Sequence, residues 1–228
     1  MEKQNKFLVI FAIASVIFLM LSGVFCFVDS WLKSENTKQT TLGSYRPAIN
    51  EWKEFFTVKK VGVSGTYVNE LNEPGNYDLV YSLKDLNCDN IPELVIAYIS
   101  KDGTETIVNQ IFTLDGNKIV DIFGHYEKNG FWSRNRLQVA KDGYFVVTGS
   151  WGADGFVKTV YYLKANETIV STIEKLGMNN EDRINGTGDA KWWDFKNNVP
   201  STKEKFDILA TKYGKELTFD WKMLEKGK

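Results

Sequence analysis

The chain has 228 residues, of which 43% are hydrophobic and 25% are charged, and its formal net charge is -1. This composition predicts one ordinary globular domain plus an additional segment, and the near-zero charge excludes a strong basic field that would recruit nucleic acid. The single histidine, His125, excludes metal sites that need two histidines. Cys26 lies in an apolar run and Cys88 in an acidic loop, so no disulfide framework is expected.

The N-terminus carries an uncharged apolar segment, residues 7–28. As a helix it would be about 33 Å long, enough to span a hydrocarbon core of about 30 Å. Lys3 and Lys6 precede the segment and Asp29 follows it, which predicts a cytoplasmic N-terminal tip. We therefore expect residues 1–28 to be a tip and a single-pass transmembrane anchor. A cleaved signal peptide and a lipidated form are the alternatives, and all three place the main domain outside the cytoplasm.

The next segment, residues 29–44, is rich in Ser, Thr, Asn and Gln and is typical of a flexible stalk. The extracellular domain is expected to occupy residues 45–228. Apolar side chains recur at helical spacing from Ile49 to Phe56, which predicts an amphipathic helix over residues 47–57.

The middle of the chain has the pattern of antiparallel strands. Residues 77–83 alternate apolar and polar side chains, and residues 94–99 form a continuous apolar run that indicates a more deeply buried strand. Repeated Asp-Gly pairs supply the positive φ angles that tight hairpin turns need. Further strands are expected at 107–114, 118–123, 144–150, 156–163 and 168–175, joined as a meander.

The C-terminal part is predicted to be helical. Ser201 and Glu204 form a capping-box pattern, an apolar stripe runs from Phe206 to Tyr213, and Gly214 is a natural helix stop. The expected fold class is therefore α+β, with an antiparallel meander sheet between an N-terminal and a C-terminal helix.

The loop that follows the first strand has the spacing of a cation site. Asp85, Asn87, Asp89 and Glu93 supply side-chain oxygens at loop positions 1, 3, 5 and 9, and the carbonyl of Ile91 is available at position 7. This spacing lets one short loop surround a hard cation such as Ca²⁺. The flanking segments have strand patterns, which excludes an EF-hand. The alternative is a loop whose Asp and Asn side chains cap their own backbone without a metal.

The segment Tyr81–Leu94 resembles the Asp-x-Asn-Gly-Asp-Gly-Ile-Pro-Glu-Leu strand–loop–strand of FG-GAP/VCBS-like repeats. It is most similar to the single-copy form in small, poorly characterised surface proteins of Gram-positive bacteria. The resemblance is specific over residues 77–123 and implies that the four side chains named above bind a structural Ca²⁺. Cys88 and Asn90 depart from the pattern, which has Gly at both positions. The motif occurs once, which argues against a propeller.

The remaining patterns leave three functional hypotheses. The leading one is a non-enzymatic binding or structural module with a glycan or protein partner at the cell envelope, because no catalytic cluster is recognisable. One alternative is an envelope hydrolase that acts on glycan or peptide through carboxylates. The other is a glycan-binding module that stacks sugars on tryptophans; the candidates are Trp132, Trp151, Trp192 and Trp193.

Overall fold

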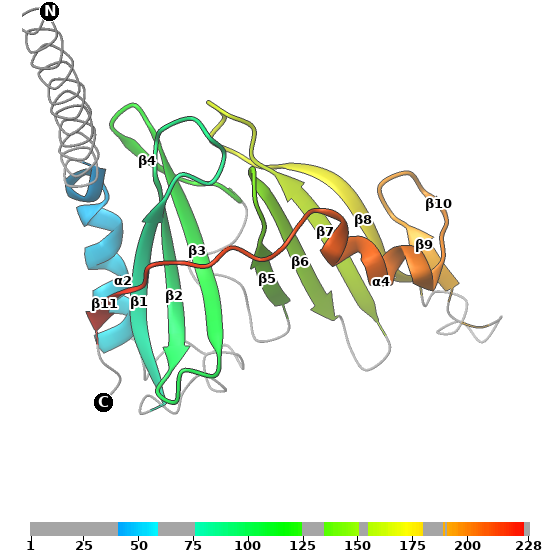
Figure 1. Cartoon of the computed structure of the whole chain (residues 1–228), viewed down its shortest axis with the longest axis horizontal. Coiled ribbons are helices and arrows are strands. Elements are labelled where there is room, and N and C mark those ends of the chain that lie inside the picture. Colours follow the sequence, from blue (N-terminus) through cyan, green and yellow to red (C-terminus); the bar gives the residue numbers. More distant parts are fainter. Residues whose placement is uncertain are drawn as a thin grey trace, which may run out of the picture. The chain divides into compact units, whose positions relative to one another are not determined.

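The computed structural model describes residues 41–58, 76–124, 135–150, 155–179, 189 and 191–225. The chain divides into two compact units, Met1–Gly43 and Ser44–Lys228, and the sheets of Figure 1 belong to the second. The expected membrane segment and residues 29–40 of the expected stalk lie outside the described residues, whereas residues 41–44, at the end of the expected stalk, are helical. Within the described part, no helix is both long and apolar enough to cross a membrane.

Most of the regular structure in the described residues is β-strand, arranged in two antiparallel sheets (Figure 1). The first sheet has five strands in the order β11-β1-β2-β3-β4, and the second has six in the order β10-β9-β8-β7-β6-β5. The elements are α2 (Arg46–Val58), β1 (Tyr77–Lys84), β2 (Glu93–Ser100), β3 (Thr106–Asp115), β4 (Lys118–Asp121), β5 (Asn135–Val139), β6 (Tyr144–Ser150), β7 (Phe156–Tyr162), β8 (Ser171–Asn179), β9 (Lys191–Asp194), β10 (Val199–Pro200), α4 (Lys203–Lys212) and β11 (Lys222–Glu225).

The expected α+β class with a single meander sheet is therefore wrong, because the described residues are mostly β-strand and form two sheets. The predicted hairpins form, but the ladder is interrupted after β4, and β5 begins a second sheet. The last strand, β11, returns to pair with β1 instead of extending the meander. Local turn signals determine which strands are neighbours, whereas the break and the return depend on long-range packing that no local pattern encodes.

Strand β2 is buried on both faces, which explains its continuous apolar sequence. Successive side chains of a strand point to opposite faces. Leu94, Ile96 and Tyr98 therefore pack in the cluster beneath α2, while Val95 and Ala97 enter the core that the two sheets share. The predicted deep burial of this strand is confirmed.

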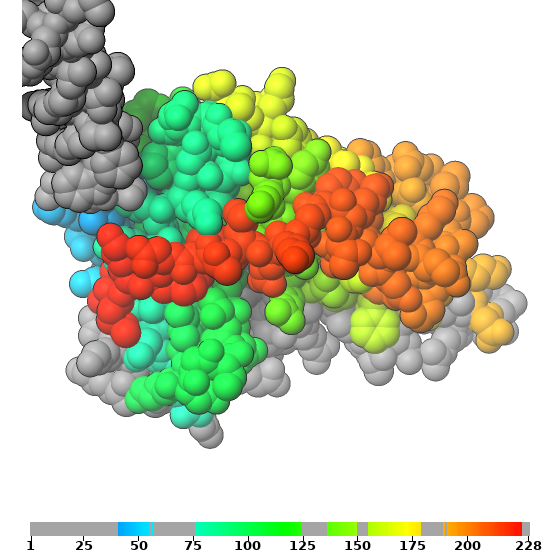
Figure 2. Space-filling view, in the orientation of Figure 1, coloured from blue at the N-terminus to red at the C-terminus, as the bar shows by residue number. Residues whose placement is uncertain are grey.

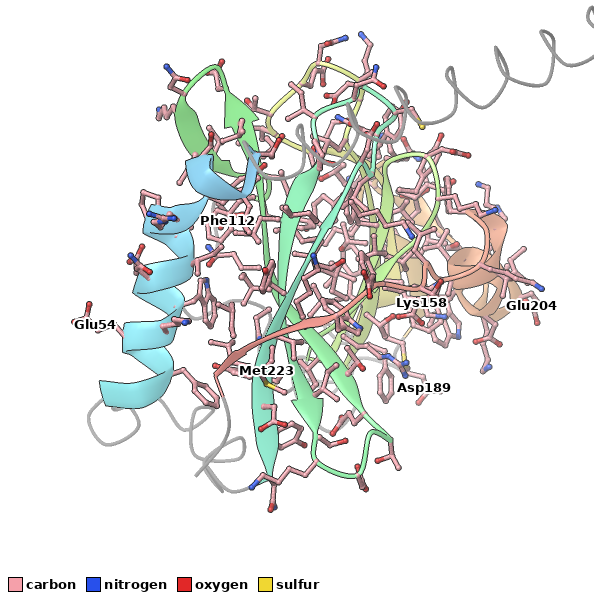
Figure 3. The ribbon with its side chains drawn as sticks, turned by 60° about the vertical axis from the view of Figure 1, so that its left-hand side comes forward. Glu54, Phe112, Lys158, Asp189, Glu204 and Met223 are labelled. Carbon is pink, nitrogen blue, oxygen red and sulfur yellow. The ribbon has the colours of Figure 1, made fainter. Side chains whose placement is uncertain are left out.

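Helix α2 covers one face of the five-stranded sheet, as its amphipathic pattern predicts. Trp52 and Phe56 are buried, and their rings contact the ring of Tyr98 at centroid distances of 6.3 and 5.6 Å. Phe112 of β3 packs against the same cluster, whereas Glu54 points away from the sheet (Figure 3). The helix thus attaches through one stripe of aromatic side chains.

The opposite face of this sheet shares its core with the six-stranded sheet. Val80 and Ile111 from the first sheet belong to the same buried cluster as Phe145 and Val147 from β6. Phe123, just after β4, packs edge-on against Phe145 at 5.5 Å. One continuous apolar core therefore holds the two sheets together.

Helix α4 covers the outer face of the six-stranded sheet. Phe206 and Leu209 pack on the side chains of β6, β7 and β8 that face away from the shared core. The Lys158 ammonium, which lies between this sheet and α4 (Figure 3), donates to the carbonyl of Phe206 at 2.9 Å. The N-cap is Thr202 and not the predicted Ser201, because the Thr202 hydroxyl accepts from the Lys205 N–H.

The chain after α4 crosses both sheets before it ends. Figure 2 shows this segment running over the surface of the molecule toward β11. The Leu217 N–H donates to the Val139 carbonyl at the edge of the second sheet, and the Lys84 ammonium of the first sheet donates to the Thr218 carbonyl. Strand β11 then completes the first sheet, so this segment contacts both sheets.

Candidate cation site

The acidic loop joins β1 to β2 and contains two residues in the left-handed region of backbone space. Cys88 has φ 62° and Asn90 has φ 68°. These are the two positions at which the resembling pattern has Gly, and Gly adopts positive φ without steric cost. The thiol-bearing residue is exposed, so Cys88 occupies this conformation without filling the interior of the loop.

We expect Cys88→Gly to raise the free energy of unfolding by up to about 1.5 kcal/mol. The left-handed conformation costs an L-residue about 1–2 kcal/mol, and the greater freedom of Gly in the unfolded chain offsets about 0.5–1 kcal/mol of the gain. Asn90→Gly is the matched control and should gain less, because Asn tolerates this region better. Urea unfolding measures both variants. A destabilised Cys88→Gly, or a larger gain in Asn90→Gly, would contradict the expectation.

The two aspartates fold the loop around their own carboxylates. The Asp85 oxygens accept from the backbone N–H groups of Asp89 at 3.2 Å and Asn90 at 2.9 Å. One Asp89 oxygen accepts from the Ile91 N–H at 2.8 Å. The capping hydrogen bonds of the metal-free alternative are therefore present. Both Asp85 oxygens and Asp89 Oδ1 accept one hydrogen bond each and keep a lone pair for a cation, whereas Asp89 Oδ2 already accepts two, from Asn87 Nδ2 and the Asn166 N–H.

Glu93, the first residue of β2, is completely buried. Its carboxylate accepts from the Leu86 N–H at 2.8 Å and from the Thr113 hydroxyl at 3.0 Å. Burial raises the pKa of Glu93 to about 7; the two hydrogen bonds act in the opposite direction, and the Asp89 and Asp85 charges add to the rise. The carboxyl group thus sits at the base of the loop and carries an energetic penalty when charged and unpaired.

Tyr45, which precedes α2, fixes the end of the loop. Its hydroxyl lies 3.0 Å from the Pro92 carbonyl and 3.2 Å from the Phe112 carbonyl, so it can donate to either. The ring is fully buried, and burial raises the pKa of the phenol. Tyr45, the residue before α2, therefore links the end of the loop to β3.

Asn87 is the residue whose contacts are incomplete. It is only 6% exposed. Its Nδ2 donates to an Asp89 oxygen at 2.9 Å and to the Lys164 carbonyl at 3.3 Å, and these two acceptors fix the orientation of the amide. The Oδ1 atom is buried and has no hydrogen-bond partner among the residues that the structure describes. A buried carbonyl oxygen in this state costs about 1–3 kcal/mol, and a cation is the partner that would satisfy it.

The charges of the loop are likewise unbalanced. None of the carboxylates of Asp85, Asp89 and Glu93 forms an ion pair with a lysine or arginine of the described chain. Among the described residues, no three Asp, Glu, His or Cys side chains lie so that they could hold a metal ion, and this includes Asp85, Asp89 and Glu93. A site here would therefore need the Asn87 amide oxygen and the Ile91 carbonyl beside the carboxylates, a donor set of hard oxygens that suits Ca²⁺.

Glu93 is not placed to act on a substrate. A carboxyl group with a raised pKa is a mark of a general acid. However, Glu93 has no exposed surface, and both of its oxygens accept hydrogen bonds from within the domain. In this arrangement it cannot contact a glycan or peptide substrate.

The other candidates from the sequence do not join this loop. Trp192 is half-buried and packs on Phe206 of α4 at a centroid distance of 4.8 Å. Trp193 is also half-buried, and its indole N–H donates to the Asn198 side chain at 3.3 Å. His125, Trp132 and Trp151 lie outside the described residues.

Four contacts of the site come from residues that the loop sequence does not reveal. Tyr45 and Thr113 contact its base, and the turn after β7 supplies the Lys164 carbonyl and the Asn166 N–H. The sequence indicated Tyr45 only as the first residue of the domain. The other three carry no local signal, because they are brought to the loop by the pairing of distant strands.

The chain matches no known family, no curated protein and no solved structure. The likeness to FG-GAP/VCBS-like loops therefore rests on the sequence pattern of residues 77–123 alone.

Proposed function

We propose that the Asp85–Glu93 loop holds a Ca²⁺ ion that braces a non-catalytic binding or structural module of the cell envelope. The observation that carries this proposal is the buried Asn87 Oδ1, which has no partner inside a loop of three carboxylates. Calcium supplies a divalent positive charge and accepts irregular sets of oxygen ligands. The residues that would hold it are Asp85, Asn87, Asp89, Ile91 (through its carbonyl) and Glu93.

The role of the ion is structural in this proposal. Binding would satisfy the Asn87 oxygen and favour the charged form of Glu93, so both unfavourable features of the apo loop would be removed together. With three carboxylates and one amide, a dissociation constant of about 10⁻⁴–10⁻³ M is expected, in the range of extracellular modules. Such a site is filled where Ca²⁺ is abundant.

The proposed location is outside the cytoplasm, and it rests on the apolar residues 7–28 with the preceding lysines. A glycan or protein of the envelope is the partner class proposed for the domain. The placement of Glu93 away from solvent favours a binding or structural role over hydrolysis through this carboxylate.

The test is the thermal unfolding of the full-length protein with EDTA and with about 10 mM Ca²⁺. Binding at the expected affinity stabilises the folded state by about 1.4–2.7 kcal/mol, a rise in Tm of about 3–10 °C. Asp85→Asn should lose the rise, because it removes one ligand charge.

Asp115→Asn is the matched control. It makes the same change in net charge at an exposed position on the β3–β4 hairpin, so it should keep the full rise in Tm. The proposal is overturned if Ca²⁺ leaves the wild-type Tm unchanged, or if Asp85→Asn and Asp115→Asn respond equally.

A further inference from the structure

The acidic loop of the first sheet is in direct contact with a turn of the second sheet. This turn, residues 163–170, connects β7 to β8. Two hydrogen bonds cross between them: Asn87 Nδ2 donates to the Lys164 carbonyl at 3.3 Å, and the Asn166 N–H donates to an Asp89 oxygen at 3.1 Å. The contact is thus made by two of the residues that would hold the ion.

The turn is held in a defined shape on its own side. The Glu167 N–H donates to the Lys164 carbonyl at 3.0 Å, and Asn166 is in the left-handed region at φ 64°. Leu163, at its start, is fully buried in the core that the two sheets share. Movement of the turn relative to the loop would therefore disturb the junction between the sheets.

Asn87 is the residue through which an ion on Oδ1 would act on the turn. Its Oδ1 has no partner, while its Nδ2 already bonds both Asp89 and the turn. A cation on Oδ1 polarises the amide and makes the Nδ2 hydrogens better donors. The same Nδ2 group donates to the Asp89 oxygen that accepts from Asn166. An ion bound in the loop would then affect both hydrogen bonds to the turn.

We propose that cation binding in the Asp85–Glu93 loop locks this loop to the 163–170 turn through Asn87, and so couples the two sheets. This inference rests on the proposed function. It adds a consequence that the cation site alone does not require: the ion controls the junction between the sheets as well as the shape of one hairpin. A change in Ca²⁺ concentration would therefore change how readily the 163–170 turn, which connects β7 to β8, separates from the loop of the first sheet.

Hydrogen–deuterium exchange on the full-length protein, with EDTA and with about 10 mM Ca²⁺, tests the proposal, and calorimetry on the same samples reports binding. In the wild type, exchange should slow about threefold or more in peptides covering residues 85–93 and also in those covering 163–170. Peptides from α4, which packs on the far face of the second sheet, should not change and serve as the internal reference.

Asn87→Asp is the discriminating variant, because it keeps an oxygen ligand and removes the Nδ2 donors. Calorimetry should still detect Ca²⁺ binding, and residues 85–93 should still be protected, but the protection of 163–170 should be lost. Full protection of 163–170 in this variant would overturn the coupling.

The wild-type comparison decides the matter even if Asn87→Asp does not fold. Binding with protection confined to 85–93 would overturn the coupling and leave the cation site standing. Absence of any calorimetric binding by the wild type would overturn the proposed function and the coupling together.

Discussion

Replacing Trp52 by alanine is expected to lower the free energy of unfolding by about 3–5 kcal/mol, the range for deleting a buried tryptophan from a core. The side chain is 5% exposed and meets the Tyr98 ring edge-on. Its indole N–H also donates to the Gln110 side chain at 2.8 Å. The substitution therefore leaves a cavity between α2 and the sheet and removes a polar partner at the same place.

Urea unfolding measures the loss, with Asn50→Ala as the control on the exposed side of the same helix. The control should stay within about 0.5 kcal/mol of the wild type, as exposed substitutions usually do. A loss below about 1 kcal/mol for Trp52→Ala would mean that α2 does not depend on this stripe. The substitution should also destabilise the acidic loop, because Tyr45, which precedes α2, hydrogen-bonds the end of the loop.

Raising the pH in EDTA is expected to destabilise the protein through Glu93. Its pKa is about 7 in the folded state, against an ordinary value of 4.5. Below pH 4.5 the group is protonated in both states, and its contribution to stability is fully present. Between about pH 4.5 and 7 the unfolded chain releases the proton first, so stability falls, and the loss is complete above about pH 7. The difference in pKa corresponds to about 3 kcal/mol.

Glu93→Gln isolates this contribution, because the amide cannot titrate and can still accept from the Leu86 N–H. Chemical unfolding from pH 5 to 8 should show a decline in the wild type that is absent from the variant. Asp121, whose pKa burial also raises, is common to both proteins and cancels in the comparison. Parallel pH profiles for the two proteins would show that Glu93 is not the titrating group. Added Ca²⁺ should reduce the wild-type decline, because the ion favours the carboxylate.

The hairpins were predictable because their signals are local. Alternating side chains placed β1, and the Asp142-Gly143 pair placed the turn before β6; both residues have positive φ in the structure. The amphipathic stripe gave α2 to within one residue at each end. Each of these features is decided by neighbours in the sequence, so reading the sequence was sufficient.

The division into two sheets was not predictable, because it depends on distant residues. Strand β11 pairs with β1 from the other end of the domain, and β5 and β9 have only five and four residues, respectively. Strands this short carry too few residues for an alternation pattern to stand out. Without these strands, one sheet was predicted where the structure has two.

The candidate site was likewise predictable only in part. The spacing from Asp85 to Glu93 identified the loop, and the left-handed φ angles of Cys88 and Asn90 explain why Gly is usual at both positions. The burial of Glu93 and the unpartnered Asn87 oxygen come from the packing of three other segments against the loop. A pattern of oxygen-bearing residues locates such a site, but only the packing shows which atom lacks a partner.

The most direct test of the cation site is the side-chain amide signal of Asn87 in ¹H–¹⁵N spectra of the full-length protein during a Ca²⁺ titration. Loss of the signal in Asn87→Asp assigns it. If the loop binds Ca²⁺ through Oδ1, the signal shifts and saturates with a Kd of about 10⁻⁴–10⁻³ M. A signal that stays fixed while Ca²⁺ rises to about 10 mM, ten times the weaker limit of that range, would contradict the assignment of this loop as a cation site.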